Sequence, residues 1–232
     1  MLIFNLSYII MIKQKHIMLI FILIITVGIY LLLINKYNCK KISIFGYGSL
    51  MSVKEIKETC SSANNFRPGI LDNFTRSFSF IHNNKYNNQA ILTIKPSNSN
   101  HVRGVIFDIP EYELNNFLQR EKHYNIKKLN ILDNNKLQEC YVCVDCNTQY
   151  KDYIKCLTCG STIVPDYDYL ILCLNNIFKI NTINNSFHNL KTNYINNFLN
   201  DSYLADCKTN IKQYIKQNSS QFSKKINFLI NY

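Results

Sequence analysis

The chain lacks the clusters of arginine, or of basic residues interleaved with aromatic ones, that nucleic-acid-binding proteins use. Its 26 lysine and arginine residues outnumber 15 acidic residues and give a formal net charge of +11. The lysines are scattered, however, and the abundance of asparagine, isoleucine and tyrosine beside them is what AT-rich coding produces. The net charge is therefore weak support for a basic function, and we expect no nucleic-acid partner.

Glycine is also scarce, with 6 residues in 232, and its placement excludes two kinds of site. A strand-like run, Ile42–Phe45, leads into Gly46-Tyr47-Gly48-Ser49. A dinucleotide fingerprint would need a third glycine at position 51, where the chain has Met51. A nucleophile elbow would need glycines in place of Tyr47 and Met51. Two interpretations remain, which are a plain tight turn and a cradle whose backbone N–H groups bind an anion or a carbonyl group.

The number of cysteines is nine, and an odd number argues against a complete disulfide framework. Two CxxC pairs, Cys143/Cys146 and Cys156/Cys159, have a spacing that suits a structural zinc site with four thiolate ligands. Free thiols in a loop are an equal alternative, and a disulfide is a third. Any such zinc would be structural and distant from the chemistry, and we expect no cofactor for catalysis.

The run Ile17–Ile34 carries no charged residue. About 20 apolar residues span a bilayer, so this run is just long enough, and no small-residue cleavage site follows it. The sequence therefore predicts an uncleaved transmembrane anchor within residues 1–40 and a single-pass membrane protein, with a cleaved signal as the alternative. Lysines flank the run on both sides, and their balance leans slightly towards a cytosolic carboxyl-terminal domain.

From Lys41 onward the sequence predicts an α+β fold, in the form of a small β-barrel or mixed sheet with flanking helices. Alternating apolar residues predict strands at 42–45, 74–80, 90–94, 105–109 and 137–144. A capping-box pattern, Ser52–Glu55, predicts a helix to about Cys60. Pro110 opens a second helix, and the pattern after Pro165 is helical. We expect this domain to cover residues 41–200, with a basic helical tail over 201–232.

The helix after Pro110 places one carboxylate on an apolar face. Steps of three, one, three and three residues put five side chains on that face: Leu114, Phe117, Leu118, Glu121 and Tyr124. Burying a charge costs several kcal/mol unless the charge is paired or neutralised. Glu121 is therefore either a salt-bridged structural residue or a cavity residue with a raised pKa.

The ordered motifs FGYGSL, RPGILDNFTRSFSF, ILTIKP and VRGVIFDIP, followed by Glu121 and Tyr124 as ExxY, resemble the γ-glutamylcyclotransferase superfamily. The resemblance continues through PDYDYLILCL and HNLKTNYINNFL and covers roughly 42–199. The last segment is similar to the glutathione-specific, ChaC-type members. Met51-Ser52 after the YGSL motif is closer to AIG2-like members, and Asn189 stands where a glycine is expected. These departures leave glutathione as substrate less well supported than cyclotransfer itself.

The resemblance implies an enzyme that converts glutathione or another γ-glutamyl compound into 5-oxoproline and a free amine. It implies a γ-glutamylcyclotransferase-like barrel, a small-molecule γ-glutamyl partner and Glu121 as the catalytic acid/base. It also implies that Tyr47, Gly48, Ser49 and Leu50 bind the substrate, with Tyr124 beside them. The alternative is a catalytically silent binding module of the same fold held at a membrane.

Overall fold

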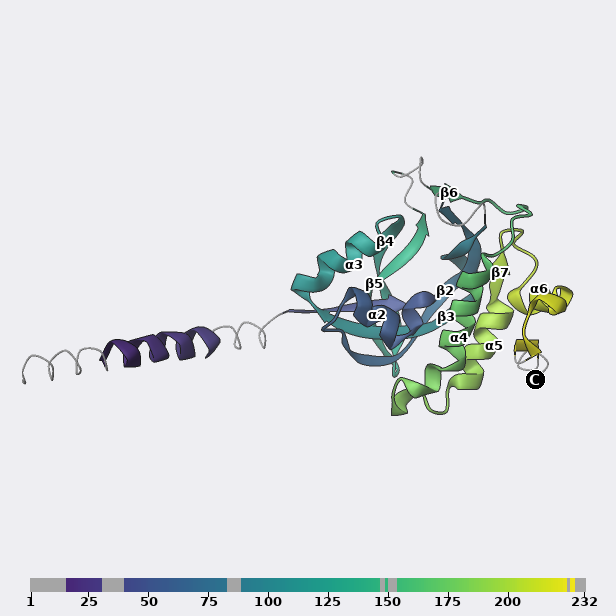
Figure 1. Cartoon of the computed structure of the whole chain (residues 1–232). Coiled ribbons are helices and arrows are strands. Elements are labelled where there is room, and N and C mark those ends of the chain that lie inside the picture. Colours follow the sequence, from purple (N-terminus) through teal and green to yellow (C-terminus); the bar gives the residue numbers. More distant parts are fainter. Residues whose placement is uncertain are drawn as a thin grey trace, which may run out of the picture. The chain divides into compact units, whose positions relative to one another are not determined.

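A computed structural model of the chain describes residues 16–30, 40–82, 89–146, 149, 154–224 and 226–227. The chain divides into two units, Met1–Lys40 and Lys41–Tyr232. The second unit contains the sheet and the remaining described helices (Figure 1).

The amino-terminal unit corrects one prediction. Its helix covers residues 16–30, and residues 31–34 of the predicted membrane span lie outside the described residues. Within the described ranges, no helix is both long and apolar enough to cross a membrane. The predicted transmembrane anchor and the single-pass localisation are therefore wrong. The membrane partner and the cytosolic orientation depended on that anchor and are not supported.

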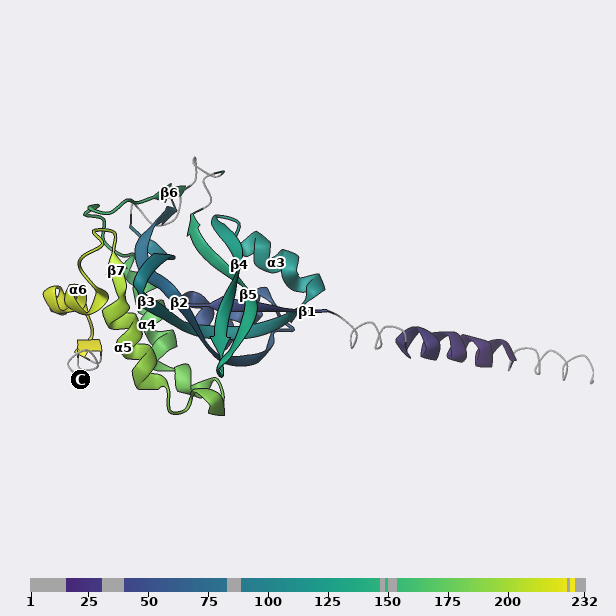
Figure 2. The same cartoon turned by 180° about the vertical axis from the view of Figure 1, so that it is seen from behind.

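The strands of the second unit close into a small mixed barrel (Figures 1 and 2). The strands are β1 (Lys41–Gly46), β2 (Asn64–His82), β3 (Ile91–Pro110), β4 (Tyr124–Asp133), β5 (Lys136–Cys146), β6 (Ile154–Cys156) and β7 (Ser202–Leu204). The order β3-β1-β5-β4-β2 is closed by pairing of β2 with β3. The β1–β5 pair is parallel and the other barrel pairs are antiparallel. The predicted α+β fold with a small barrel is confirmed.

Helices flank this barrel. The helices and short 3-10 segments are η1 (Ser49–Met51), α2 (Val53–Thr59), η2 (Glu111–Glu113), α3 (Leu114–Arg120), α4 (Tyr167–Phe178), η4 (Ile180–Thr182), η5 (Asn185–Phe187), α5 (Lys191–Asp201), α6 (Ile211–Gln217) and η6 (Ser219–Gln221). α4 and α5 pack against each other, and α5 lies against β3 (Figure 1). α4 contacts η1, so the turn after β1 is covered from this side. The main core includes the barrel interior and the buried faces of α4 and α5.

The helix that carries Glu121 is shorter than the apolar pattern predicts. α3 ends at Arg120, Glu121 caps it, and β4 begins at Tyr124. The strand β4 was absent from the predicted elements. It joins β5 through the two-residue turn Asn134-Asn135, in which both φ angles are positive, at 45° and 67°. Such turns match the twist of paired strands, and asparagine tolerates positive φ better than most residues.

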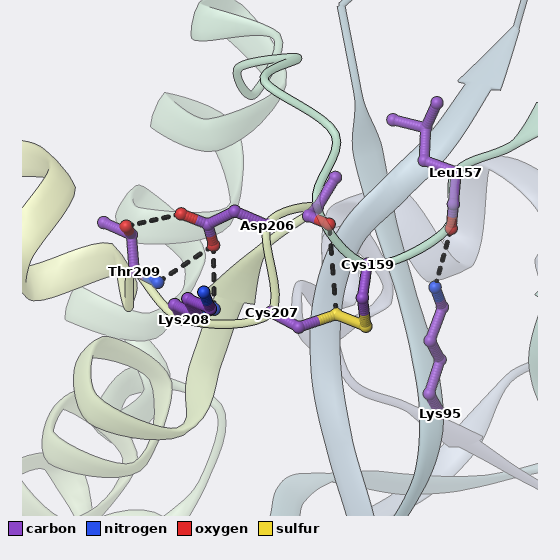
Figure 3. The surroundings of a disulfide bond; sticks show 8 residues. Lys95, Leu157, Cys159, Asp206, Cys207, Lys208 and Thr209 are labelled. Atoms are coloured by element: carbon purple, nitrogen blue, oxygen red, sulfur yellow. Dashed lines mark hydrogen bonds between the residues drawn. A yellow bond between two sulfur atoms is a disulfide. The ribbon is translucent and has the colours of Figure 1, made fainter.

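The cysteines correct a second prediction. Cys159 forms a disulfide with Cys207, which joins the segment after β6 to the loop after β7 (Figure 3). Cys156 is also disulfide-bonded, whereas Cys143 is a buried free thiol. Zinc binds thiolates, and a sulfur in a disulfide cannot serve as one. The predicted zinc site of Cys143, Cys146, Cys156 and Cys159 is therefore wrong, and the described residues contain no cluster of histidine, cysteine or acidic side chains able to hold a metal.

Candidate active site

A pocket of about 280 Å³ lies where β1 ends. Its walls come from the turn after β1, from β2 and β3, from the end of α3 and from β4, β5 and α4. The lining residues are Phe45, Gly46, Tyr47, Gly48, Ser49, Leu50, Phe80, Ile91, Leu92, Arg120, Glu121, His123, Tyr124, Cys143 and Tyr169. A concave site that combines apolar walls with convergent polar groups is typical of small-molecule binding.

The two glycines of the turn are held in close contact with their surroundings. A Cβ atom on Gly46 would lie 2.3 Å from the backbone oxygen of Leu50, so the turn closes only with glycine at that position. A Cβ atom on Gly48 would lie 3.1 Å from the Tyr169 hydroxyl and 3.2 Å from a methyl carbon of Leu92. Both of these neighbours line the pocket. The absence of side chains at the two glycines therefore keeps this wall of the pocket open.

Two polar side chains fix the turn from outside the pocket. Arg76 is 1% exposed, and its Nε donates to the backbone oxygen of Tyr47 at 2.9 Å. The same guanidinium donates from Nη1 to Oδ1 of Asn197 at 2.9 Å. Burial lowers the pKa of Arg76 to about 10, so it stays protonated at neutral pH. Asn176 donates to the backbone oxygen of Ser49 at 3.1 Å. The backbone of the turn is thus fixed by the barrel and by α4.

Glu121 reaches the pocket from the end of α3. Its backbone N–H donates to the oxygen of Phe117 at 3.0 Å, and the residue is 9% exposed. Its Oε1 lies 2.9 Å from Nε of Arg120. The sequence left a salt-bridged glutamate and a cavity glutamate as alternatives. The structure combines them, because Glu121 is paired with Arg120 and also lines the pocket.

The surroundings of Glu121 favour its neutral form. Burial raises the pKa of Glu121, while the charge of Arg120 and hydrogen bonds from Cys143 and Arg120 act against this rise. Burial also raises the pKa of the Cys143 thiol well above its ordinary value, and the nearby Glu121 carboxylate adds to this. Cys143 therefore remains a thiol at neutral pH and acts as a hydrogen-bond donor rather than a nucleophile.

Three tyrosines, of which Tyr47 is buried and Tyr124 and Tyr169 are partly buried, complete the polar part of the pocket. Tyr47 donates its hydroxyl to the backbone oxygen of Cys143 at 2.7 Å, and Tyr124 donates to the backbone oxygen of Leu92 at 3.0 Å. Burial raises the pKa of Tyr47, Tyr124 and Tyr169 well above the ordinary tyrosine value. All three hydroxyls are therefore neutral at physiological pH. Those of Tyr47 and Tyr124 already donate to backbone oxygens and can accept a hydrogen bond from a ligand.

The structure brings the predicted catalytic and substrate-binding residues to one pocket: Tyr47, Gly48, Ser49, Leu50, Glu121 and Tyr124. Their roles remain predictions. Cys143 lies in the same wall, although it was expected to be a zinc ligand. Sequence reasoning missed Arg120 and Tyr169. Tyr169 lies within the PDYDYLILCL motif, and Arg120 is next to Glu121. Both residues are therefore part of, or adjacent to, the sequence features from which the site was predicted.

No protein-family model matches the chain, and no curated protein matches it in sequence. Among solved structures, a γ-glutamyl cyclotransferase matches at 20% identity, over 48% of this chain and 75% of its own, with a TM-score of 0.42. A γ-glutamyl cyclotransferase specific to glutathione from yeast matches at 14% identity, over 60% and 87% of the two chains, with a TM-score of 0.44.

An AIG2-like protein from Mus musculus matches at 18% identity, over 47% of this chain and 79% of its own, with a TM-score of 0.35. TM-scores below 0.5 leave the activity of this chain to be argued from its own pocket. The matched structures carry the names of the superfamily that the sequence motifs resemble.

Proposed function

We propose that this protein is a γ-glutamylcyclotransferase, which converts glutathione or another γ-glutamyl compound into 5-oxoproline and a free amine. The observation that carries the proposal is that Glu121 and the turn from Tyr47 to Leu50 line the same pocket. A buried carboxylate with a raised pKa across a cavity from a glycine turn matches what this reaction needs from a protein.

The reaction itself is intramolecular. The α-amine of the γ-glutamyl group attacks its own γ-carbonyl, a five-membered ring forms, and the bond from this carbonyl carbon to the leaving nitrogen breaks. Because nucleophile and electrophile belong to one molecule, their effective concentration is high and the protein need not supply a nucleophile. The protein must orient the γ-glutamyl group, transfer protons from the attacking nitrogen to the leaving nitrogen and stabilise the oxyanion.

Glu121 is the group that we assign to proton transfer. Its carboxylate accepts a proton from the α-ammonium group, which frees the amine for attack. The protonated Glu121 then gives this proton to the leaving nitrogen as the bond to the carbonyl carbon breaks. The second proton, which the attacking nitrogen loses as it becomes the ring N–H, ends on the freed amine as its ammonium group. A carboxyl group with a raised pKa suits both steps better than a solvated glutamate, because its protonated form is a larger fraction at the working pH.

The turn after β1 is the group that we assign to binding. The first hydrogen bond of η1 runs from the N–H of Met51 to the oxygen of Gly48, at 3.1 Å. The N–H groups of Gly48, Ser49 and Leu50 precede that bond, and N–H groups before the first bond of a helical turn are available to ligands. They suit a substrate carboxylate or the developing oxyanion.

The test is to incubate the full chain with glutathione and with a set of γ-glutamyl amines and to measure 5-oxoproline by mass spectrometry. We expect 5-oxoproline and the free amine in equal amounts, and neither with the Glu121→Gln variant. Absence of 5-oxoproline with every γ-glutamyl compound would show that the proposal is wrong.

A second candidate is a binding module of the same fold that performs no chemistry. The ion pair between Arg120 and Glu121 favours this candidate, since such a pair opposes the raised pKa that an acid/base needs. Calorimetric binding of a γ-glutamyl compound, in the absence of any 5-oxoproline, would identify the binding module. Turnover would eliminate it.

A further inference from the structure

Arg120 makes contacts in two directions. On one side its Nε pairs with Oε1 of Glu121 at 2.9 Å. On the other side its Nη1 donates to the backbone oxygen of Glu55 at 2.8 Å and to Oγ1 of Thr59 at 2.7 Å. The side chain is only 25% exposed and lines the pocket. A guanidinium with three defined acceptors is held in one orientation, which a solvated surface arginine is not.

These contacts join the two parts of the candidate active site. Glu55 and Thr59 belong to α2, which follows the turn from Tyr47 to Leu50 almost directly in the chain. Glu121 belongs to the end of α3, which is distant in sequence. Arg120 therefore connects the carboxylate to the helix that carries the proposed substrate-binding turn.

We propose that Arg120 is a positioning residue of the cyclotransfer reaction, which keeps the Glu121 carboxylate charged and fixes it relative to the turn through its contacts with α2. The inference rests on the proposed function. Arg120 acts through Glu121 rather than on the substrate, and the two halves of its role, charge and anchoring, can be tested separately.

The other titratable groups facing this carboxylate do not carry the positive charge of Arg120. Cys143 from β5, Tyr47 from the turn, Tyr124 from β4 and Tyr169 from α4 are neutral at physiological pH, because burial raises the pKa of each. His123, from the segment between α3 and β4, is the remaining titratable residue of the pocket wall. Above the pH range in which a histidine titrates, Arg120 is therefore the basic residue of this pocket wall that stays charged. Its effect on the charge of Glu121 should persist in that pH range.

The charge half is tested by measuring the pKa of Glu121 directly, by carbon-13 NMR of side-chain carboxyl groups, with the resonance assigned from the Glu121→Gln variant. In Arg120→Met we expect the pKa of Glu121 to rise by about one pH unit or more, because an opposite charge within ~4–6 Å typically lowers a carboxyl pKa by about that much. Arg120→Lys should restore most of the wild-type value.

Lys128→Met is the matched control, since it also removes one positive charge from an ion pair, with Glu139, outside the pocket. It should leave the pKa of Glu121 unchanged. An unchanged Glu121 pKa in folded Arg120→Met, or equal shifts in Arg120→Met and Lys128→Met, would overturn the charge half of the proposal. This measurement needs no substrate, so it gives an answer even if the proposed reaction proves wrong.

The anchoring half is tested with Thr59→Val, which removes one acceptor of Arg120 and keeps its charge and the size of the side chain. We expect kcat to fall roughly 3- to 10-fold, with KM and the Glu121 pKa little changed, as for loss of orientation rather than of binding.

The pH dependence of kcat/KM separates the two variants. In Arg120→Met the midpoint of the acidic limb should move to higher pH, in step with the pKa measured by NMR. In Thr59→Val it should stay where it is in the wild type. A Thr59→Val enzyme with a lower melting temperature and an unchanged kcat would show that the contact is only structural. Should Arg120→Met not fold, Arg120→Gln, which also removes the charge, takes its place in the NMR measurement.

Discussion

The two ends of strand β4 hold two groups of buried charges that are satisfied to different degrees. Asp133, at the end of β4, and Asp108 on β3 both pair with Arg67, at 2.6 Å and 3.0 Å. Asp108 also accepts hydrogen bonds from Ser43 and Asn65, at 2.8 Å and 2.7 Å. This Arg67 cluster lies outside the pocket.

Glu121 lies near the start of β4 and, like each of these aspartates, is paired with one arginine. It pairs with Arg120 alone, at 2.9 Å, and burial raises its pKa. It also faces a pocket of about 280 Å³, which the Arg67 cluster does not. A buried carboxylate such as that of Asp108, with several hydrogen bonds and a place outside the pocket, stabilises the fold, whereas one that faces a cavity is available for chemistry.

The strongest way to test this contrast is Glu121→Gln. The substitution keeps the shape of the side chain and removes its capacity to accept a proton. Loss of a general base typically costs roughly 10²- to 10⁴-fold, so 5-oxoproline formation should fall at least about 100-fold. Circular dichroism and thermal unfolding should show a folded protein. Wild-type turnover in this variant would remove Glu121 from the mechanism.

Gly48→Val tests the other wall of the pocket. A Cβ atom at Gly48 already lies 3.1 Å from the Tyr169 hydroxyl and 3.2 Å from Leu92, so a branched side chain must displace both or occupy the pocket. We expect turnover to fall by roughly 30-fold or more, and overpacking to cost about 1–3 kcal/mol of stability. Gly48→Ala should lose less turnover and less stability than Gly48→Val. A fully active, folded Gly48→Val would place substrate binding elsewhere.

The pH dependence should report the raised pKa of Glu121. Because the base must be ionised to accept a proton, kcat/KM should fall about tenfold per pH unit below that pKa, and the midpoint should lie above the ordinary glutamate value of about 4.3. The same pKa shift makes the free energy of unfolding depend on pH. The stabilisation from the neutral carboxyl group is fully present below the ordinary glutamate pKa, which applies to the unfolded chain. It is lost as the pH rises through the raised pKa of the folded protein. An acidic limb centred at or below about 4.3 would contradict this assignment.

Much of the barrel and of the site could be predicted from local sequence. Ile42–Phe45 shows its strand pattern directly, and the glycine turn needs only a few adjacent residues. Glu121 was recognised from an apolar helical face, although α3 ends before it. The turn at Glu121 and the start of β4 place Glu121 and Tyr124 in the same pocket, although the helix that was predicted to carry both ends before them.

The rest depended on contacts between distant segments, which a pattern in one segment does not record. The disulfide between Cys159 and Cys207 links residues 48 positions apart, whereas the CxxC spacing suggested zinc. Arg120 was overlooked because its importance comes from α2, about 60 residues earlier. The hairpin at Asn134-Asn135 could have been found, since paired asparagines tolerate the positive φ angles of a two-residue turn.

Asp108→Asn should have the smallest effect on activity, and it is the matched counterpart of Glu121→Gln at the other end of β4. Oδ1 of Asp108 accepts hydrogen bonds from Ser43 and Arg67, and Oδ2 accepts one from Asn65. In either orientation the new amide group presents N–H donors to a neighbour that is itself a donor. Arg67 also loses one of its two charged partners while it remains half-buried.

We expect Asp108→Asn to lower the free energy of unfolding by on the order of 3 kcal/mol, because breaking a buried ion pair from one side leaves the other charge uncompensated. Turnover per folded molecule should stay within about twofold of wild type, since Asp108 does not line the pocket. Denaturant unfolding and 5-oxoproline assays below the unfolding transition measure the two quantities on the same sample. A variant of normal stability that loses turnover would reverse the roles of the two ends of β4, because Asp108 would then contribute to the chemistry rather than to the fold.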